Sequence, residues 1–198
     1  GLIHSIRTGE GQVVDSAMVD GSLSLMSFFY SLKEMGHWDD KRESNLLDGY
    51  AHFYDTYECK DNKYIAIGSI EPQFYSELLD KLGIDDERFL DQYNKKLWPE
   101  LKQVIASKIM QKTRLEWQDI FSDTDACVTP VLDMSEAQEN IHNLKRNAFT
   151  NIDGFNQPSA SPRFSKTKPE IKYNAKKVGI DLDDICNEFG LSKEALSN

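Results

Sequence analysis

The sequence predicts a mixed α/β fold, and three observations lead to this class. Segments with apolar residues three or four positions apart alternate along the chain with short runs rich in β-branched and aromatic residues. Two of those short runs flank a turn sequence, an arrangement that is typical of a β-hairpin. The helical segments outnumber the strand segments, and the sequence contains no internal repeat.

The first 36 residues predict the end of a helix, a strand and a longer helix. Apolar positions near the start indicate a helix that stops at Gly9 or Gly11, because helices commonly end on glycine. Residues 12–17 contain two adjacent valines and predict a short buried strand. Residues 18–36 show helical spacing and end on a glycine that suits a C-cap. A chain that opens inside a helix is expected to be a fragment.

The clearest local prediction is a β-hairpin followed by a helix. The runs at residues 53–57 and 64–67 flank a Lys-Asp-Asn turn, whose residue types tolerate the left-handed conformations of a hairpin. Pro72 then takes the first helical position, where its missing N–H group costs nothing, and Glu71 falls at the N-cap. This helix is expected to end at Gly83.

Further elements follow in the second half of the chain. They are a helix that Pro99 opens and that extends to Ile109, a helix that a capping box at residues 113–116 starts, an edge strand at residues 126–132 that Pro130 interrupts, and a short helix at residues 135–140. Beyond residue 149 the chain is polar and proline-rich, which predicts extended backbone. An amphipathic segment at residues 182–189 comes last, with Gly190 as its C-cap.

Composition excludes several classes of protein. Hydrophobic residues make up 39% and aromatic residues 11% of the chain, as in globular proteins and unlike disordered ones. The 33 acidic residues outnumber the 23 basic ones and give a net charge of -10, so nucleic-acid binding is not expected. The longest nearly apolar stretch, around residues 26–30, is far shorter than the about 20 residues that span a bilayer, so no membrane association is expected.

The cysteine and histidine patterns argue against disulfides and metal sites. The 3 cysteines are odd in number and far apart, and the 4 histidines are scattered, with none of them at ligand spacing. The sequence also lacks the charged and apolar regions of a secretory signal. A reducing, cytoplasmic compartment is therefore expected.

Glu71 is the ionisable residue whose position stands out. It lies between a strand end and a helix start, where α/β folds place functional groups because backbone N–H groups and the helix dipole are available there. The alternative is a carboxylate that only caps its helix, worth about 0.3–1 kcal/mol. For His52, nearby, a hydrogen-bonded structural role is expected. Nucleotide-binding and hydrolase motifs are absent, so the residues alone name no reaction.

Four ordered blocks of the sequence show a family resemblance. They are residues 11–21, parts of 46–75, residues 122–132 and residues 162–165. Together they resemble the α-methylacyl-CoA racemases of the family III CoA-transferase superfamily. The segment Ile70-Glu71-Pro72-Gln73-Phe74-Tyr75 resembles the racemases more than the CoA-transferases. The resemblance implies a family III CoA-transferase-like α/β fold, with part of a large Rossmann-like domain and a small α/β domain that contains the β-hairpin.

The resemblance also implies a domain organisation. The chain matches roughly the C-terminal half of such a protein, so residues 1–48 would be the last part of the large domain and a linker. Residues 49–146 would form the small domain, and residues 147–198 would return to the large domain. The family's dimers interlock, and each active site combines the large domain of one subunit with the small domain of the other. We therefore expect a homodimer, interlocked or domain-swapped.

By the same resemblance, the intact protein is expected to be an isomerase that epimerises 2-methylacyl-CoA thioesters by α-proton transfer through an enolate. The family's proton-transfer His and Asp lie upstream of Gly11, so this chain alone is expected to be inactive. The glutamate that Glu71 matches orients the catalytic histidine through a hydrogen bond. Leu47 and Tyr54 are candidates to line the acyl pocket. No metal or redox cofactor is implied, because coenzyme A is part of the acyl-CoA substrate.

Two alternatives stay open. A family III CoA-transferase would use the upstream Asp as a nucleophile and would form acyl-anhydride and CoA-thioester intermediates. A non-catalytic module would bind acyl-CoA or a protein partner tightly without chemistry. The Glu71 segment argues against the transferase, and the lack of a visible cationic phosphate cradle argues against the module.

Overall fold

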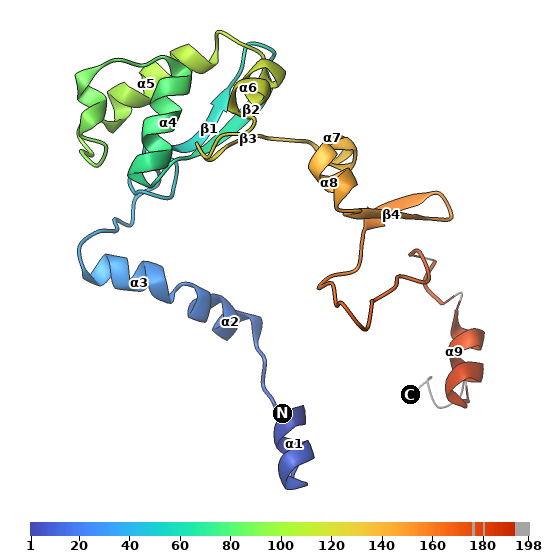
Figure 1. Cartoon of the computed structure of the whole chain (residues 1–198). Helices are drawn as coiled ribbons and strands as arrows, with labels where there is room; N and C mark the ends of the chain where they lie inside the picture. Colours follow the sequence, from blue (N-terminus) through green and yellow to red (C-terminus); the bar gives the residue numbers. More distant parts are fainter. Residues whose placement is uncertain (176, 180, 193–198) are drawn as a thin grey trace. The chain divides into compact units, whose positions relative to one another are not determined.

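The structure is a computed structural model that describes residues 1–175, 177–179 and 181–192 (Figure 1). Helices combine with two small antiparallel sheets, so the predicted mixed α/β class is confirmed. The chain divides into two compact units, Gly1–Val131 and Leu132–Asn198. The sequence predicts a different division, into residues 1–48, 49–146 and 147–198. That division describes domains of the complete family fold, and it stays a prediction.

The first unit is built around a three-stranded antiparallel sheet with the order β1-β2-β3. Strands β1 (Tyr54–Glu58) and β2 (Tyr64–Gly68) form the predicted hairpin, and Asn62 in its turn has the left-handed φ of 57° that the sequence indicates. Strand β3 (Val128–Pro130) pairs with the other side of β2. Pro130 therefore lies on an outer strand, as predicted, because proline cannot donate to a central ladder.

Helices α4 (Pro72–Leu82), α5 (Trp98–Ile109) and α6 (Arg114–Phe121) pack around this sheet, and the short 3₁₀ helix η1 (Glu87–Leu90) lies between α4 and α5 in the chain (Figure 1). Helix α5 lies against β1 and α4, and α6 lies against β2 and β3. The core side chains that are most completely buried are Trp98, Phe53, Phe89, Ile65, Leu78, Leu101, Ile105 and Ile109. Burial of each such side chain contributes about 1.5–3 kcal/mol, so these elements form one stable body.

The predicted caps define the helix ends. Gly83 follows α4 with a left-handed φ of 61°, and Pro72 occupies the first turn at the other end of the helix. Thr113 and Glu116 form both bonds of the predicted capping box at the start of α6. Local sequence signals therefore specify the boundaries of the helices that surround the sheet.

Three helices precede the sheet, and every residue in them is at least partly exposed: α1 (Leu2–Thr8), α2 (Met18–Leu25) and α3 (Ser27–Glu34). The prediction of a buried strand at residues 12–17 is wrong. Val13 and Val14 are 96% and 63% exposed, because no strand within the described ranges lies beside this segment to pair with it. The single helix predicted over residues 18–36 is interrupted at Met26, which separates α2 from α3.

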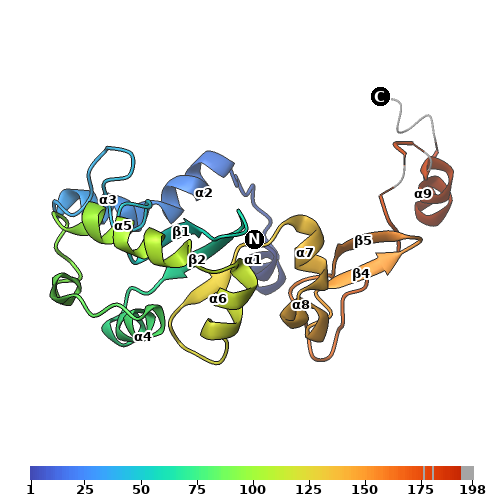
Figure 2. The same ribbon diagram turned by 90° about the horizontal axis from the view of Figure 1, so that it is seen from above.

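The described residues of the second unit form two short helices, a hairpin and a further helix: α7 (Met134–Glu139), α8 (Ile141–Lys145), β4 (Phe149–Ile152), β5 (Phe155–Pro158) and α9 (Leu182–Phe189) (Figure 2). Helix α9 and its cap at Gly190 are confirmed. The β4–β5 hairpin was not predicted. Its turn consists of Asp153 and Gly154, which both have positive φ, and Asp-Gly is a strong hairpin signal that the sequence does contain.

Candidate functional site

The end of β2 is held by hydrogen bonds on both sides of the strand. The N–H of Gly68 donates to the carbonyl of Cys127 at 2.9 Å, and the N–H of Ser69 donates to the carbonyl of Phe53 at 3.0 Å. The Ser69 hydroxyl donates to the carbonyl of Ala126 at 2.5 Å. These bonds join the strand end to the segments that lead into β1 and β3. The backbone that enters α4 is therefore rigidly placed.

Glu71 directly follows this strand end and occupies the N-cap of α4 with extended backbone, φ -73° and ψ 143°. Its side chain is exposed, and among the described residues it accepts no capping hydrogen bond from α4. Glu71 therefore makes no hydrogen-bonded cap in the described structure, and the choice between a functional carboxylate and one that only acts on the helix dipole stays a prediction. Its charge also acts on Cys127: partial burial raises the pKa of that thiol, and the negative charge of Glu71 raises it further.

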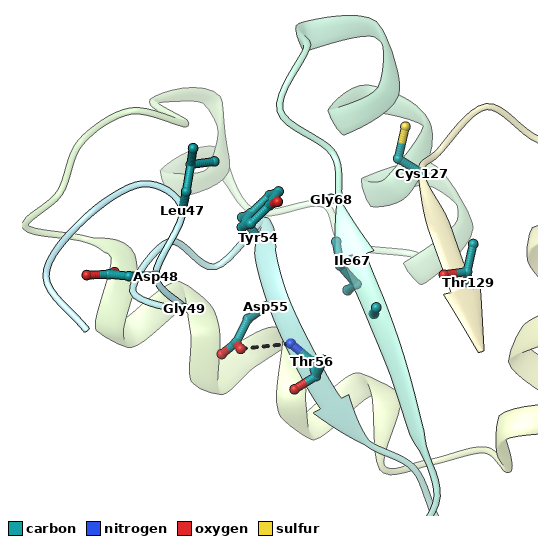
Figure 3. A pocket seen from close by; sticks show the side chains of 11 residues that line it. Leu47, Asp48, Gly49, Tyr54, Asp55, Thr56, Ile67, Gly68, Cys127 and Thr129 are labelled. Atoms are coloured by element: carbon teal, nitrogen blue, oxygen red, sulfur yellow. Dashed lines mark hydrogen bonds between the residues drawn. The ribbon is translucent and has the colours of Figure 1, made fainter. Parts of the chain in front are cut away.

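A pocket of about 470 Å³ lies against the face of the sheet that points away from the core (Figure 3). Both predicted pocket residues, Leu47 and Tyr54, line it, and Cys127 and Thr129 line the opposite side. Gly68 pairs with Tyr54 across the two strands, and a Cβ at Gly68 would lie 3.7 Å from the Tyr54 ring. Small side chains on this face of the sheet therefore leave the space that the pocket occupies.

Asp48 fixes the loop that presents Leu47 to the pocket. Its carboxylate accepts the backbone N–H groups of Ser44 at 3.1 Å and Asn45 at 2.8 Å, and the Asn45 amide at 2.7 Å. Burial acts to raise the pKa of Asp48, but the hydrogen bonds from Asn45 and Ser44 outweigh it, and the pKa is lowered. Asp48 therefore stays ionised in a structural role.

A second carboxylate on the pocket wall, Asp55, forms an ion pair with Lys102 of α5. Lys102 also donates to the carbonyl of Gly49. Gly49 has a φ of 89°, and a Cβ there would lie 3.3 Å from the Asp55 carboxylate. Glycine is therefore favoured at this position, because the backbone is in the left-handed region and a Cβ would crowd the Asp55 carboxylate.

His52 lies fully buried just before β1 in the chain. Its Nε2 lies 2.7 Å from the hydroxyl oxygen of Tyr75, and its backbone carbonyl accepts the hydroxyl of Tyr57 at 2.6 Å. The rings of Phe53 and Phe89 surround the imidazole edge to face. Burial lowers the pKa of His52 to about 4, so the ring is neutral near pH 7. The predicted hydrogen-bonded structural role of His52 is confirmed.

Sequence reasoning missed several pocket residues, among them Gly68, Cys127 and Thr129. The pairing of β2 with β3 brings residues about 60 positions apart in the chain to one surface, and such long-range pairing leaves no local signal. The alternation of small and large side chains along β2 is the sequence signal that could have predicted part of the pocket. Ala66 and Gly68 alternate with the buried Ile65 and Ile67, so small side chains face away from the core.

The structure also bears on the expectations about disulfides, metal sites and membrane-spanning segments. Cys59, Cys127 and Cys186 are free thiols in the structure. Nowhere in the described ranges do three or more His, Cys, Asp or Glu side chains gather closely enough to hold a metal ion. The described helices are all too short or too polar to cross a membrane. The expectations about cofactors stay predictions.

The small sheet, its surrounding helices and the exposed carboxylate at the junction of β2 and α4 match the α/β class that the sequence predicts. The model of the CoA-transferase family III matches residues 1–181, and the chain therefore belongs to this family. The resemblance found in the sequence is confirmed.

Curated relatives include two α-methylacyl-CoA racemases. The chain is 41% identical to the one from Mus musculus and 38% identical to the one from Homo sapiens, each over 98% of this chain and 52% of the relative. It is 33% identical to the CaiB/baiF CoA-transferase family protein ZK892.4 of Caenorhabditis elegans, over 81% of this chain and 45% of that protein. The chain thus spans about half the length of the curated relatives it matches.

Solved structures support the fold. A CAIB/BAIF family protein from Brucella suis matches with a TM-score of 0.72 and 18% identity, over 94% of this chain and 50% of that one. Rv3272 from M. tuberculosis, in its orthorhombic form, matches with a TM-score of 0.65 and 16% identity, over 86% and 44%. At these identities the matches show the fold alone, and the predicted family III CoA-transferase-like fold is confirmed.

Proposed function

We propose that this chain is the C-terminal portion of an α-methylacyl-CoA racemase-like isomerase that epimerises 2-methylacyl-CoA thioesters. The observation that supports it is the 38–41% identity to two racemases over 98% of the chain. The family assignment over residues 1–181 agrees with an acyl-CoA substrate.

In this reaction a base removes the α-proton, and the electron pair moves into the thioester carbonyl to form an enolate. An acid then returns a proton to the opposite face of the α-carbon, which inverts the centre. The proton-transfer His and Asp belong, in this proposal, to a part of the protein outside this chain. The chain alone is then inactive.

Glu71 acts on that histidine rather than on the substrate. Its carboxylate accepts the N–H of the imidazole, which fixes the tautomer and raises the basicity of the other ring nitrogen. Two observations support this role: the Glu71 side chain is exposed, and within the described residues α4 does not use it as a cap.

The pocket beside Leu47 and Tyr54 holds the acyl chain of the substrate. Its volume of about 470 Å³ falls within the roughly 300–1,000 Å³ that is usual for small-molecule sites. The apolar surface of Leu47 and the face of the Tyr54 ring suit a branched hydrocarbon. The proposal requires no metal or redox cofactor, because coenzyme A arrives as part of the substrate.

The functional form is a homodimer, interlocked or domain-swapped, in the cytoplasm. Support for self-association comes from α1, α2 and the segment between them, where large apolar side chains are exposed: Leu2, Ile3, Ile6, Val13, Met18 and Leu25. Such a surface favours association with other protein surface. Neither nucleic acid nor membrane is a partner in this proposal.

The test is α-proton exchange of 2-methylacyl-CoA in deuterated water, with this chain and with a longer version that includes the upstream coding region. We expect deuterium incorporation only with the longer version. CoA transfer to a free acid without α-proton exchange would favour the transferase. Tight acyl-CoA or protein binding by this chain, without exchange by either version, would favour a non-catalytic module, and exchange by this chain alone would disprove the assignment of the catalytic pair.

A further inference from the structure

The buried side-chain amide of Gln92, in the segment between η1 and α5, bonds to the backbone just before Glu71. The Nε2 of Gln92 donates to the carbonyl of Ser69 at 3.1 Å and to the carbonyl of Ile70 at 3.0 Å. The backbone carbonyl of Gln92 in turn accepts the indole N–H of Trp98 at 2.8 Å. Because Gln92 and Trp98 are both buried, the bond from the Trp98 indole also fixes Gln92 against the core.

These bonds fix the peptide group that precedes Glu71. The carbonyl of Ile70 and the N–H of Glu71 belong to the same planar peptide group, so a bond to the first restrains the second. The Tyr93 hydroxyl also donates to the Ile70 carbonyl, at 2.7 Å. On the other side, the Glu71 carbonyl accepts the N–H of Tyr75 at 2.9 Å. Both peptide groups that flank the Glu71 Cα are thus hydrogen-bonded, and the direction of its Cα–Cβ bond is set.

We propose that Gln92 is a positioning residue for Glu71, because its carboxamide sets the direction in which the Glu71 carboxylate leaves the strand end. This inference rests on the proposed function, in which that carboxylate orients a histidine. A hydrogen bond between two side chains tolerates only small errors in position, and a displacement of about 1 Å at an active site can cost about 100-fold in rate.

A purely structural role for Gln92 gives a different expectation. In that case the amide only satisfies two buried carbonyls and attaches the η1–α5 segment to the core. Its loss would then weaken the fold without any specific dependence on Glu71. Amide exchange at residues 69–75 tests whether Gln92 restrains the backbone at Glu71, and a double-mutant cycle with Glu71 separates the two roles.

The first measurement uses this chain and does not depend on the reaction. Gln92→Met keeps the side-chain length and removes both donors, and Gln103→Met makes the same change at an exposed glutamine of α5. We expect amide hydrogen exchange in the peptide covering residues 69–75 to become about 10-fold faster in Gln92→Met and to stay unchanged in Gln103→Met. Unchanged exchange in Gln92→Met would overturn the inference.

The second measurement uses the longer version and α-proton exchange. We expect Gln92→Met to lower kcat by about 10- to 100-fold with KM unchanged, and to have less than about 2-fold effect when Glu71→Gln is already present. An equal loss in both backgrounds would mean that Gln92 is only structural. Absence of α-proton exchange in the unmodified longer version would disprove the proposed function, whereas the amide-exchange result would still show whether Gln92 restrains the backbone at Glu71.

Tyr93→Phe provides a second test of the inference if Gln92→Met does not fold. It removes one bond to the Ile70 carbonyl, and more than half of the Tyr93 side chain is exposed, so the fold is expected to tolerate it. We expect a smaller loss of kcat, about 3-fold, that also disappears in the Glu71→Gln background. A loss that persists there would contradict positioning through this peptide group.

Discussion

The hydroxyl oxygen of Tyr75 lies 2.7 Å from Nε2 of His52 in a fully buried contact between the segment before β1 and the first turn of α4. Within the described part of the chain, Nδ1 of His52 has no hydrogen-bond partner. The Tyr75 hydroxyl is thus the group that satisfies the imidazole. The same helical turn begins at Glu71, so this buried pair secures the element that presents the candidate carboxylate.

Removal of the Tyr75 hydroxyl should destabilise the first unit. Tyr75→Phe leaves the buried His52 ring without its hydrogen bond, which costs about 1–3 kcal/mol in the free energy of unfolding. Urea denaturation measures this loss. Tyr64→Phe is the matched control, because Tyr64 is 44% exposed and should change the free energy by less than about 0.5 kcal/mol. Equal stability of the two variants would show that the buried bond contributes nothing.

The stability of the chain should fall on mild acidification because of His52. Burial lowers the pKa of His52 from the ordinary 6.5 to about 4, so between these values the unfolded state binds a proton that the folded state does not. The free energy of unfolding therefore decreases as the pH falls through this window, with a slope that approaches about 1.4 kcal/mol per pH unit. Urea denaturation between about pH 7 and about pH 5 tests this slope.

Two variants identify the source of that slope. His52→Gln should flatten the dependence in this window, whereas His142→Gln, at an exposed histidine of α8, should leave it as in the unmodified chain. A slope that persists in His52→Gln would mean that another group titrates.

The fold was predictable from sequence wherever a local signal was sufficient. The hairpin turn, the capping box at Thr113 and the glycine at the end of α4 each specify their own geometry. The strand predicted at residues 12–17 failed because a strand also needs a neighbour, which two valines cannot supply. The β4–β5 hairpin was not predicted because its polar strands give no clear strand signal on either side of the Asp-Gly turn.

The residues of the candidate site were likewise predictable only where a local signal or the family resemblance marks them. The position of Glu71 follows from the adjacent Pro72 and the end of β2, all local in sequence. Leu47 and Tyr54 came from the family resemblance, and the structure places both on one pocket. Gln92 was not predictable, because 22 residues separate it from the Ile70 carbonyl that it bonds and no periodic pattern marks it.

Truncation of Leu47 should weaken substrate binding in the longer version of the protein. We expect Leu47→Ala to raise the KM for a 2-methylacyl-CoA by about 10-fold, which corresponds to the roughly 1.4 kcal/mol that a partly buried leucine loses on truncation. Leu90→Ala, at a leucine of η1 that is 85% exposed, is the matched control and should leave KM unchanged. The same KM for Leu47→Ala and the unmodified protein would place the acyl chain elsewhere.

The isolated chain should self-associate. The apolar side chains of α1, α2 and the intervening segment are exposed, with Leu2 at 82%, Val13 at 96% and Met18 at 89%. Contact with a second copy removes such surface from water at about 25 cal/mol per Å². Light scattering should therefore give a mass of at least two copies of the 22.7 kDa chain. A monodisperse monomer would refute this expectation.

The most direct test compares activity and stability in one variant, Glu71→Gln, made in the longer version of the protein. We expect α-proton exchange to fall by at least about 10-fold, while the free energy of unfolding changes by less than about 1 kcal/mol, because the side chain is exposed, makes no capping hydrogen bond in the described structure and loses only its interaction with the helix dipole. Glu87→Gln, at an exposed residue of η1, should change neither quantity. Unchanged exchange in Glu71→Gln, or a loss of exchange only in step with a loss of stability, would contradict a functional role for Glu71.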